Sequence, residues 1–556
     1  MNWRFALALL LAIAVVLVTP RLFPGRPAPV GAPSAAPGVS PTVTQPADTT
    51  QAVGANVQRA AIPTTPAQHA DTATITTAKA RLRLSSVGGA LIGAEMTGFR
   101  KLGAASGQVE LARPGAPLLT FQIVAGGETL AVNRATFRAS PSADGTSVSY
   151  SGDVGGVPVT VEWRFAADTY HVHIKGGVEP VGYVGRLTVR AAPRAGGAFL
   201  LVQLPSTFQS SERDTIGDLS RLAYVYKQNR GSVGLVRFGK PNPGERDIRR
   251  GPLDWTGAKS KYFLVGLLAP RESDAFAELQ VVGVPKVGRV ASLGNATAVV
   301  PMRNGVADLE VYVGPQESRR LAALGRDFDS ANPYGGWLQG VVQPIATFVI
   351  WLLLRMHEVS GLNYGWVLIA FGVLIRVILW PLNQTVMRSS IRMQRIQPEL
   401  QAIQKKYNGS PEKLQAEMMR VYREHGMSPF APISGCLPML IPMPVLFALF
   451  FVFQNTIEFR GVGFWWMADI SQRDPLFILP ILMGASMLLL SWLGTRNSPP
   501  NPQATMMMYT MPVVMTIAFV NFAAGLNLYY AAQNIASLPQ QWLIANERAK
   551  ASPRSG

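Results

Sequence analysis

The chain has 556 residues, which is too long for a single domain, and it is 48% hydrophobic but only 15% charged, which is too apolar for an ordinary soluble protein. Its net charge of +18 is dispersed, without a Lys/Arg-rich block or a basic motif interleaved with aromatic residues, so composition argues against DNA binding. The single cysteine, Cys436, lies in an apolar run and excludes an intramolecular disulfide. We therefore expect a membrane protein.

Residues 1–20 are predicted to contain the first membrane-spanning segment. Arg4 precedes an apolar run over residues 5–18, and by length alone this run fits either a signal peptide or a short anchor. Residues 21–71 are rich in Pro, Ala, Thr and Gln and contain few aromatic residues, which predicts a disordered linker.

Residues 72–330 show the period of two that is typical of β-strands. In the run VPVTVEWRF at 157–165, large apolar side chains occupy every second position. Glycine pairs such as Gly88-Gly89 and Gly155-Gly156 separate runs of this kind, as turns do. The pattern predicts a large all-β sandwich of antiparallel strands.

After residue 334 the pattern changes to long apolar helices. We predict spans at 364–382, 433–455, 476–493, 506–522 and 526–543, which with the N-terminal segment make six and place both termini on one side of the membrane. Residues 333–358 contain a shorter apolar core behind Gln339 and Gln343, and they are predicted to form an amphipathic helix in the membrane interface. A seventh span there would place Arg4 opposite the next basic loop, against the positive-inside rule.

Residues 383–429 are predicted to form a cytoplasmic helical hairpin. Between Arg388 and His425 there are eight Lys/Arg and four Glu, whereas the loop at 457–475 has two Arg and three acidic residues. Apolar residues recur every three or four positions on either side of an Asn-Gly-Ser-Pro turn at 408–411, which predicts two amphipathic helices. A solvated helical pair with no further role is the alternative.

Arg376 is the most informative residue of the helical region, because it lies within the apolar run GWVLIAFGVLIRVILWPL. A cation inside the bilayer costs roughly 2.5–3.5 kcal/mol. The five predicted spans contain no Asp or Glu, so we expect water, a substrate, or amides such as Gln454 and Asn527 to be its partners. An arginine that snorkels to the interface is the alternative.

The residues do not predict an enzyme, a metal site or a cofactor. The string GLVRFGK at 234–240 starts a phosphate-binding loop, but Pro241 replaces the Ser/Thr that would hold magnesium. His171 and His173 share a strand face without a further ligand nearby.

Four strings carry a family resemblance: LIRVILWPLNQ, the hairpin segment QPELQAIQKKYNGSPEKLQAEMMRVYREHGMSPFAPISGCLPMLIPMPVLFALF, DPLFILPILMGASM, and GLNLYYAAQNIASLPQQWLI. They resemble the YidC family of membrane protein insertases almost continuously from residue 337 to 545, and LSSVGGALIGAEM at 84–96 looks like the start of the periplasmic domain of the Gram-negative type.

The resemblance implies a polytopic α-helical membrane protein with six transmembrane helices, a periplasmic β-supersandwich and an uncleaved N-terminal anchor. It further implies that residues 362–545 form the insertase core around a hydrophilic groove that contains the arginine. A small polar residue that often precedes this arginine by one turn is Gly372 here. The groove residues that we predict to contact substrate are Arg376, Trp380, Gln454, Asn527, Tyr529 and Tyr530.

The expected function is insertion of nascent membrane proteins without nucleotide hydrolysis, alone or with the Sec translocon, by a monomeric core. We expect an apolar face of Met439, Leu440, Phe447, Met511 and Phe519 to guide the substrate helix into the lipid bilayer. The hairpin would receive the ribosome and the nascent chain through Arg388, Arg392, Arg395, Lys405, Lys406, Arg420 and Arg423, and the basic tail 546–556 would stay cytoplasmic with the N-terminus.

Location in the bacterial inner membrane, with the large domain in the periplasm, follows from the resemblance. A secondary transporter with a ligand-binding β-domain is the alternative function, although the chain shows no internal repeat of the kind that transporters carry.

Overall fold

The computed structural model describes residues 71–551 except 104–105, 166–170, 175–176, 181–183, 193–196, 287, 289, 333, 335–337, 382–383, 385–395, 397–398, 408–409, 426–442 and 497–501. All described residues belong to one compact unit, Thr64–Gly556. The anchor predicted at 1–20 and almost all of the linker predicted at 21–71 lie outside the described residues.

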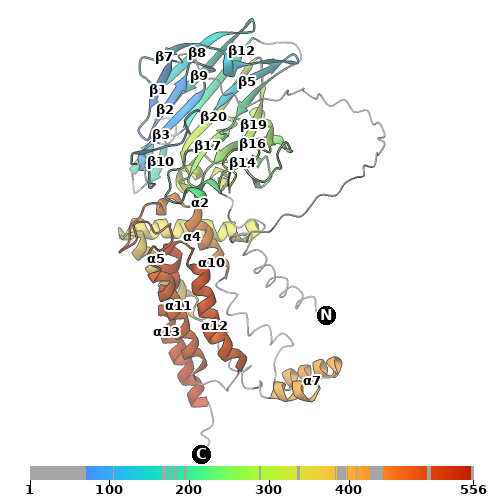
Figure 1. The fold of residues 1–556 in the computed structure, drawn as a ribbon, viewed down its shortest axis with the longest axis vertical. Helices are drawn as coiled ribbons and strands as arrows, with labels where there is room; N and C mark the ends of the chain where they lie inside the picture. Colours follow the sequence, from blue (N-terminus) through green and yellow to red (C-terminus); the bar gives the residue numbers. More distant parts are fainter. Residues whose placement is uncertain are drawn as a thin grey trace, which may run out of the picture. The chain divides into compact units, whose positions relative to one another are not determined.

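The first half of the described chain is all β, which confirms the class predicted for it (Figure 1). A 14-stranded sheet has the order β6-β5-β13-β19-β18-β16-β17-β20-β12-β9-β8-β7, and in addition β14 pairs with β16 and β15 pairs with β14. A four-stranded sheet has the order β1-β2-β3-β4, and β10 pairs with β11 in a two-stranded sheet. The strands are β1 Thr72–Thr76, β2 Ala80–Ser85, β3 Leu91–Arg100, β4 Gln108–Glu110, β5 Thr120–Ala125, β6 Glu128–Leu130, β7 Arg138–Pro141, β8 Ser147–Val154, β9 Val157–Arg164, β10 His171–Ile174, β11 Gly177–Pro180, β12 Val184–Ala191, β13 Ala198–Gln203, β14 Ala223–Gln228, β15 Val233–Arg237, β16 Arg246–Lys259, β17 Phe263–Leu268, β18 Phe276–Val282, β19 Asn295–Met302 and β20 Val306–Pro315.

One apolar core lies between the four-stranded sheet and the large sheet. Strand β9 alternates as its sequence predicts, with valine and tryptophan side chains buried and the residues between them more exposed. The buried Trp163 indole donates a 2.8 Å hydrogen bond to the carbonyl of Gly89, in the turn between β2 and β3. Gly89 has a φ of +59°, and an added Cβ would lie 3.0 Å from Val161, so glycine allows this turn to pack on β9.

The second half is helical. The short helices α2 Thr215–Leu219 and α3 Ser318–Ala323 and the 3-10 turns η1 Val132–Arg134, η2 Glu272–Asp274 and η3 Phe328–Ala331 belong to the β-domain. Helix α13 packs against both α5 and α11, α11 packs against α12, and α4 packs against α5 and α10. The bounds are α4 Gln339–Ser360, α5 Tyr364–Ile378, α7 Pro411–Glu424, α10 Met443–Asn455, η5 Ile457–Phe459, α11 Ile478–Thr495, α12 Pro502–Phe519 and α13 Ala524–Ala551.

Two helices of the described part are long and apolar enough to cross a membrane: α4, with 22 residues and a mean hydropathy of 1.4, and α11, with 18 residues and 1.8. The apolar helices at 364–378, 445–455 and 508–519 are shorter. Figure 1 shows α4 lying crosswise to the long axes of α11 and α13, a course suited to the interfacial placement predicted for residues 333–358. The count of six spans stays a prediction.

The two amphipathic helices predicted in the loop after α5 pack on each other. Residues 399–406 are helical, and α7 follows them. Ile396 and Leu400 from the first helix and Val421 and Tyr422 from α7 form a buried cluster of their own. The apolar faces therefore meet as their spacing predicts, while the cytoplasmic location of this hairpin stays a prediction.

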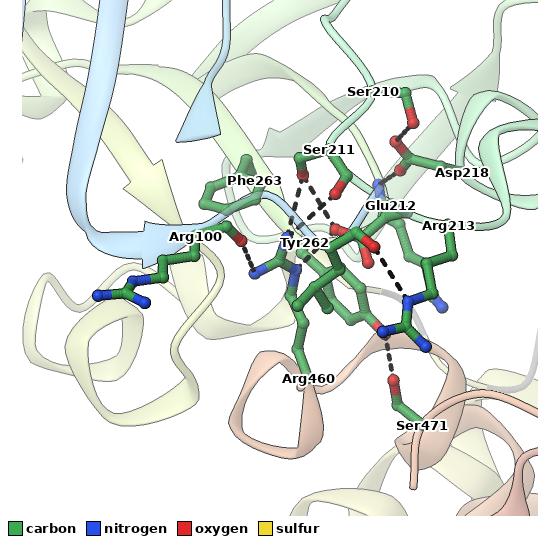
Figure 2. Close-up of polar contacts among 12 residues, drawn as sticks. Arg100, Ser210, Ser211, Glu212, Arg213, Asp218, Tyr262, Phe263, Arg460 and Ser471 are labelled. Atoms are coloured by element: carbon green, nitrogen blue, oxygen red, sulfur yellow. Dashed lines mark hydrogen bonds and ion pairs between the residues drawn. The ribbon is translucent and has the colours of Figure 1, made fainter. Parts of the chain in front are cut away.

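The β-domain contacts the loop between α10 and α11, residues 456–477, through a buried ion pair (Figure 2). Arg460 Nε lies 2.6 Å from Glu212 Oε1, and the two side chains are only 4% and 1% exposed. The same guanidinium donates to the carbonyl of Arg100 at 3.0 Å and to Ser211 Oγ at 3.3 Å. One residue of this loop, Ile457, is 3% exposed and belongs to the core of the β-domain.

We expect Arg460→Ala to weaken this contact strongly, because Glu212 would stay buried without its cation, a loss that costs about 3–5 kcal/mol. Hydrogen exchange at the backbone amides of 211–213 and 459–462 in the detergent-solubilised full chain should become faster. The matched control is Arg473→Ala, which removes an exposed arginine of the same loop and should leave exchange unchanged. Equal exchange in both variants would contradict the role given to the ion pair.

Next to this contact, burial raises the pKa of Asp218 to about 6, assisted by the charge of Glu212. Because the folded state holds this proton more tightly than the unfolded chain does, stability should fall as pH rises from about 4 to about 6 and then stay level. A shift of this size corresponds to about 3 kcal/mol. Asp218→Asn should remove that part of the pH dependence in denaturant unfolding of the full chain, and parallel pH profiles for the two proteins would contradict the assignment.

Candidate functional site

The candidate site is built around Arg376, which lies in the last turn of α5. The helix ends at Ile378, so the guanidinium is nearer to a helix terminus than the predicted span 364–382 suggested. A cation is favoured there, because the unpaired carbonyls at the end of a helix carry partial negative charge. The residue is half-buried, and its Nε is buried without a hydrogen-bond partner among the described residues.

A side-chain amide provides the observed partner of Arg376. Its terminal nitrogen donates a 2.7 Å hydrogen bond to Oε1 of Gln540 on α13. The amide nitrogen of Gln540 in turn donates to the carbonyl of Trp380 at 3.2 Å and to Gln384 Oε1 at 3.3 Å. The described residues place no carboxylate on the guanidinium, so it keeps its full charge within the protein.

Gln540 ends a buried polar stripe on α13. Gln533, Ser537 and Gln540 are 7%, 6% and 1% exposed, and their spacing of four and three residues places them on one helix face. Analysis of the sequence missed Gln540 and Gln384 as site residues. The polar period on the last span was the signal that could have revealed Gln540.

Helices α5 and α13 approach closely at Gly372, about one turn before the arginine. At Gly372, an added Cβ would lie 3.1 Å from the carbonyl oxygen of Tyr529 and 3.4 Å from Cβ of Ala532. Glycine at this position is therefore explained by packing. The ring of Phe371 lies 5.5 Å from that of Tyr529, which is 2% exposed.

The structure brings Tyr529 and Tyr530 together and places them away from the arginine along α13. Their ring centroids lie 5.5 Å apart, and Tyr530 also contacts Phe519 of α12 at 5.3 Å. Gln540 lies ten residues beyond Tyr530, which is about 15 Å along a helix. The tyrosine pair and the arginine are thus separate parts of one helix interface.

The two amides expected to serve Arg376 have other partners, which corrects that expectation. Gln454 is the penultimate residue of α10 and accepts a hydrogen bond from Arg221 of the β-domain. Asn527 is fully buried near the start of α13 and donates to the carbonyl of Phe519 at 3.2 Å. Gln454 therefore serves the contact with the β-domain, and Asn527 satisfies the carbonyl of the last residue of α12.

Three residues of the predicted apolar face lie in described segments. Phe447 and Met511 are half-buried, and Phe519 is 5% exposed and packs on Phe522 at 4.8 Å between ring centroids. Phe519 is therefore mainly a core residue of the helical region. Met439 and Leu440 lie outside the described residues.

The described basic residues of the hairpin are exposed. Arg420 pairs with Glu417 at 3.2 Å and with Glu424 at 3.3 Å, both on α7, and Lys406 lies over the ring of Tyr407. Exposed pairs of this kind contribute little to stability. Lys405 and Arg423 are also exposed, whereas Arg388, Arg392 and Arg395 lie outside the described residues.

Comparison with known proteins matches both halves of the chain. The family described as 60Kd inner membrane protein matches residues 355–551, and the family described as YidC periplasmic domain matches residues 72–348. The membrane protein insertase YidC of Anaeromyxobacter dehalogenans (strain 2CP-C) is 31% identical over 420 residues, which cover 74% of this chain and 72% of that protein.

Two further comparisons cover more of the chain. The membrane protein insertase YidC of Bordetella petrii is 27% identical over 552 residues, or 94% of this chain and 93% of that protein. A crystal structure of an active YidC insertase with the first transmembrane domain resolved covers 86% of this chain and 93% of its own, at 19% identity and a TM-score of 0.34. The chain therefore belongs to the YidC family of membrane protein insertases, with its β-domain in the periplasm and its helical region in the inner membrane.

Proposed function

We propose that this chain moves nascent transmembrane segments from the cytosol into the inner membrane, and that Arg376 receives acidic groups of the substrate in transit. The observation that carries this proposal is the pairing of Arg376 with a neutral amide, Gln540, and with no carboxylate in the described chain. A guanidinium held in this way is positioned but not neutralised, so it remains available to a passing anion.

The energetics require no nucleotide. A substrate helix of about 20 residues gains roughly 6–12 kcal/mol on entering lipid, because each apolar residue contributes about 0.3–0.6 kcal/mol. Each acidic residue of the translocated tail costs roughly 2.5–3.5 kcal/mol at the bilayer centre. A positive charge part of the way across the bilayer lowers this cost, and the protein would assist insertion by providing it.

Hydration of a groove around Arg376 forms part of the proposal. The half-buried side chain and the polar stripe Gln533, Ser537 and Gln540 support a polar path between α5 and α13. Trp380, Tyr529 and Tyr530 would contact the substrate along this path, with Met439, Leu440, Phe447 and Met511 directing its apolar face to lipid.

The relative direction of α5 and α13 is one that the six-span topology requires. Phe371 contacts Tyr529, and Arg376, five residues later, contacts Gln540, so α5 and α13 run in the same direction. Spans two and six of a six-span protein are parallel in this way. Both termini and the hairpin would then lie in the cytosol, where the hairpin would meet the ribosome, and the core would work alone or with the Sec translocon.

Arg376→Ala should impair insertion of substrates with acidic translocated tails more than insertion of neutral-tailed ones. We expect a difference on the order of tenfold, equivalent to about 1.4 kcal/mol. Arg376→Lys should keep most of the activity, because a tail in transit needs charge but no fixed bidentate geometry. Protease protection of the translocated tail in proteoliposomes measures this, with Arg355→Ala on the exposed face of α4 as the control. Equal losses on both substrates would contradict the proposal.

Gln540→Glu tests the neutrality of the partner. A carboxylate at this position would pair with Arg376 inside the protein and compete with acidic substrate groups, so the variant should resemble Arg376→Ala on acidic-tailed substrates. Gln540→Met has a similar size and adds no charge, so it should retain the preference for acidic tails. Unchanged insertion of acidic-tailed substrates by Gln540→Glu would show that the free charge is not used.

A further inference from the structure

Three cations gather on the β-domain where it meets the helical region. On one face of the large sheet, Ala223 of β14 pairs with Arg237 of β15 on one side and with Lys259 of β16 on the other. Paired residues have Cβ atoms about 4.5–5.5 Å apart, so Arg237 and Lys259 lie about 10 Å apart across a small residue. Arg221 precedes Ala223 by two positions. We call Arg221, Arg237 and Lys259 the cation triad.

Two of the three side chains are hydrogen-bonded to amide side chains, one from the helical region and one from the segment that leads into it. Arg221 donates to Gln454 at the end of α10, and Lys259 donates to Asn332, which follows η3 on the way to α4. Gln454 and Asn332 are neutral, so they orient the cations without compensating their charge. The lysine is 5% exposed, while Arg237 is exposed.

Among the described residues, the positive charges of the triad outnumber the carboxylates that act on them. Burial and the charges of Arg221 and Arg237 lower the pKa of Lys259 to about 7, and burial together with Arg237 lowers the pKa of Arg221 to about 10. Asp214 is the carboxylate that acts on Arg221, and it already accepts a hydrogen bond from Gly217 as the N-cap of α2. In the described part of the chain, Arg237 has no ion-pair partner. Like charges held together in this way indicate an anion as the missing component.

We propose that the cation triad binds the phosphate of an anionic phospholipid headgroup in the periplasmic leaflet. The guanidinium groups of Arg221 and Arg237 would hold the phosphate oxygens, which guanidinium matches in geometry. Lys259, in its protonated form, would contribute a buried charge behind them.

The position of the triad favours a lipid over a free phosphate. Gln454 is the penultimate residue of an apolar membrane helix, so the contact with Arg221 lies at the level where hydrocarbon gives way to headgroups. Basic residues near a bilayer attract anionic lipids at this level. Anchoring of the β-domain to the bilayer surface would follow, independently of the proposed role of Arg376.

The test uses the full-length chain in bicelles that contain either photoactivatable phosphatidylglycerol or photoactivatable phosphatidylcholine, with cross-linked peptides mapped over residues 221–259. We expect phosphatidylglycerol to cross-link there in preference to phosphatidylcholine. Each arginine near an anionic surface contributes about fivefold in binding, so Arg237→Gln should lower the yield about fivefold and the double variant Arg221→Gln/Arg237→Gln roughly 25-fold.

The matched control is Arg138→Gln, which removes an exposed arginine of β7 and should leave the cross-linking unchanged. Because Arg237 is exposed, its substitution should leave the fold intact, which far-UV circular dichroism checks. The single variant therefore still tests the proposal if the double variant unfolds. Equal yields for both lipids, or an unchanged yield in Arg237→Gln, would overturn the proposal. Loss of the phosphatidylglycerol cross-link on addition of micromolar inorganic phosphate would assign the triad to free phosphate and overturn the lipid assignment.

Discussion

A guanidinium that leaves water must find partners, and two arginines of the helical region meet this requirement in opposite ways. Arg460 is almost fully buried and is matched by the carboxylate of Glu212, together with backbone and hydroxyl acceptors. Arg376 has only the amide of Gln540, and its Nε is buried without a partner in the described chain. The first arrangement locks two parts of the protein together. The second retains an uncompensated charge, which is useful only if something else arrives to meet it.

The interface of α5 and α13 shows how the second arrangement is maintained. Gly372 lets the backbones approach at the level of Tyr529, so the two helices are held at a fixed distance just before the arginine. Further along, the buried polar residues of α13 replace apolar packing and end at Gln540. The close contact at Gly372 therefore positions the charge of Arg376, which lies about one turn further along α5. The hydrogen bond to Gln540 limits the rotamers of Arg376 without removing its charge.

Local patterns predicted most of the architecture, because strand alternation and helix periodicity are properties of neighbouring residues. These patterns predict the all-β domain and the packed helical pair. They also identify Arg376 as a charged residue within an apolar run. The partner of Arg376 did not, since periodicity identifies a helix face but not the rotation of one helix against another. Gln454 illustrates the same limit. From the sequence, an amide near the end of an apolar run could line a groove or contact another domain. Only the fold shows that Arg221 donates a hydrogen bond to it.

The contacts of the loop between α10 and α11 make the periplasmic domain more than an attached module. Ile457 lies in the core of the β-domain, so the loop cannot leave without opening an apolar cluster as well as breaking the ion pair of Arg460 with Glu212. The hydroxyl of Tyr262 adds a 3.1 Å hydrogen bond to Ser471 at the other side of the loop. A loop held at both sides restrains the helices that it joins, α10 and α11. Since α11 packs along α13, the restraint extends to the helix that carries Gln540.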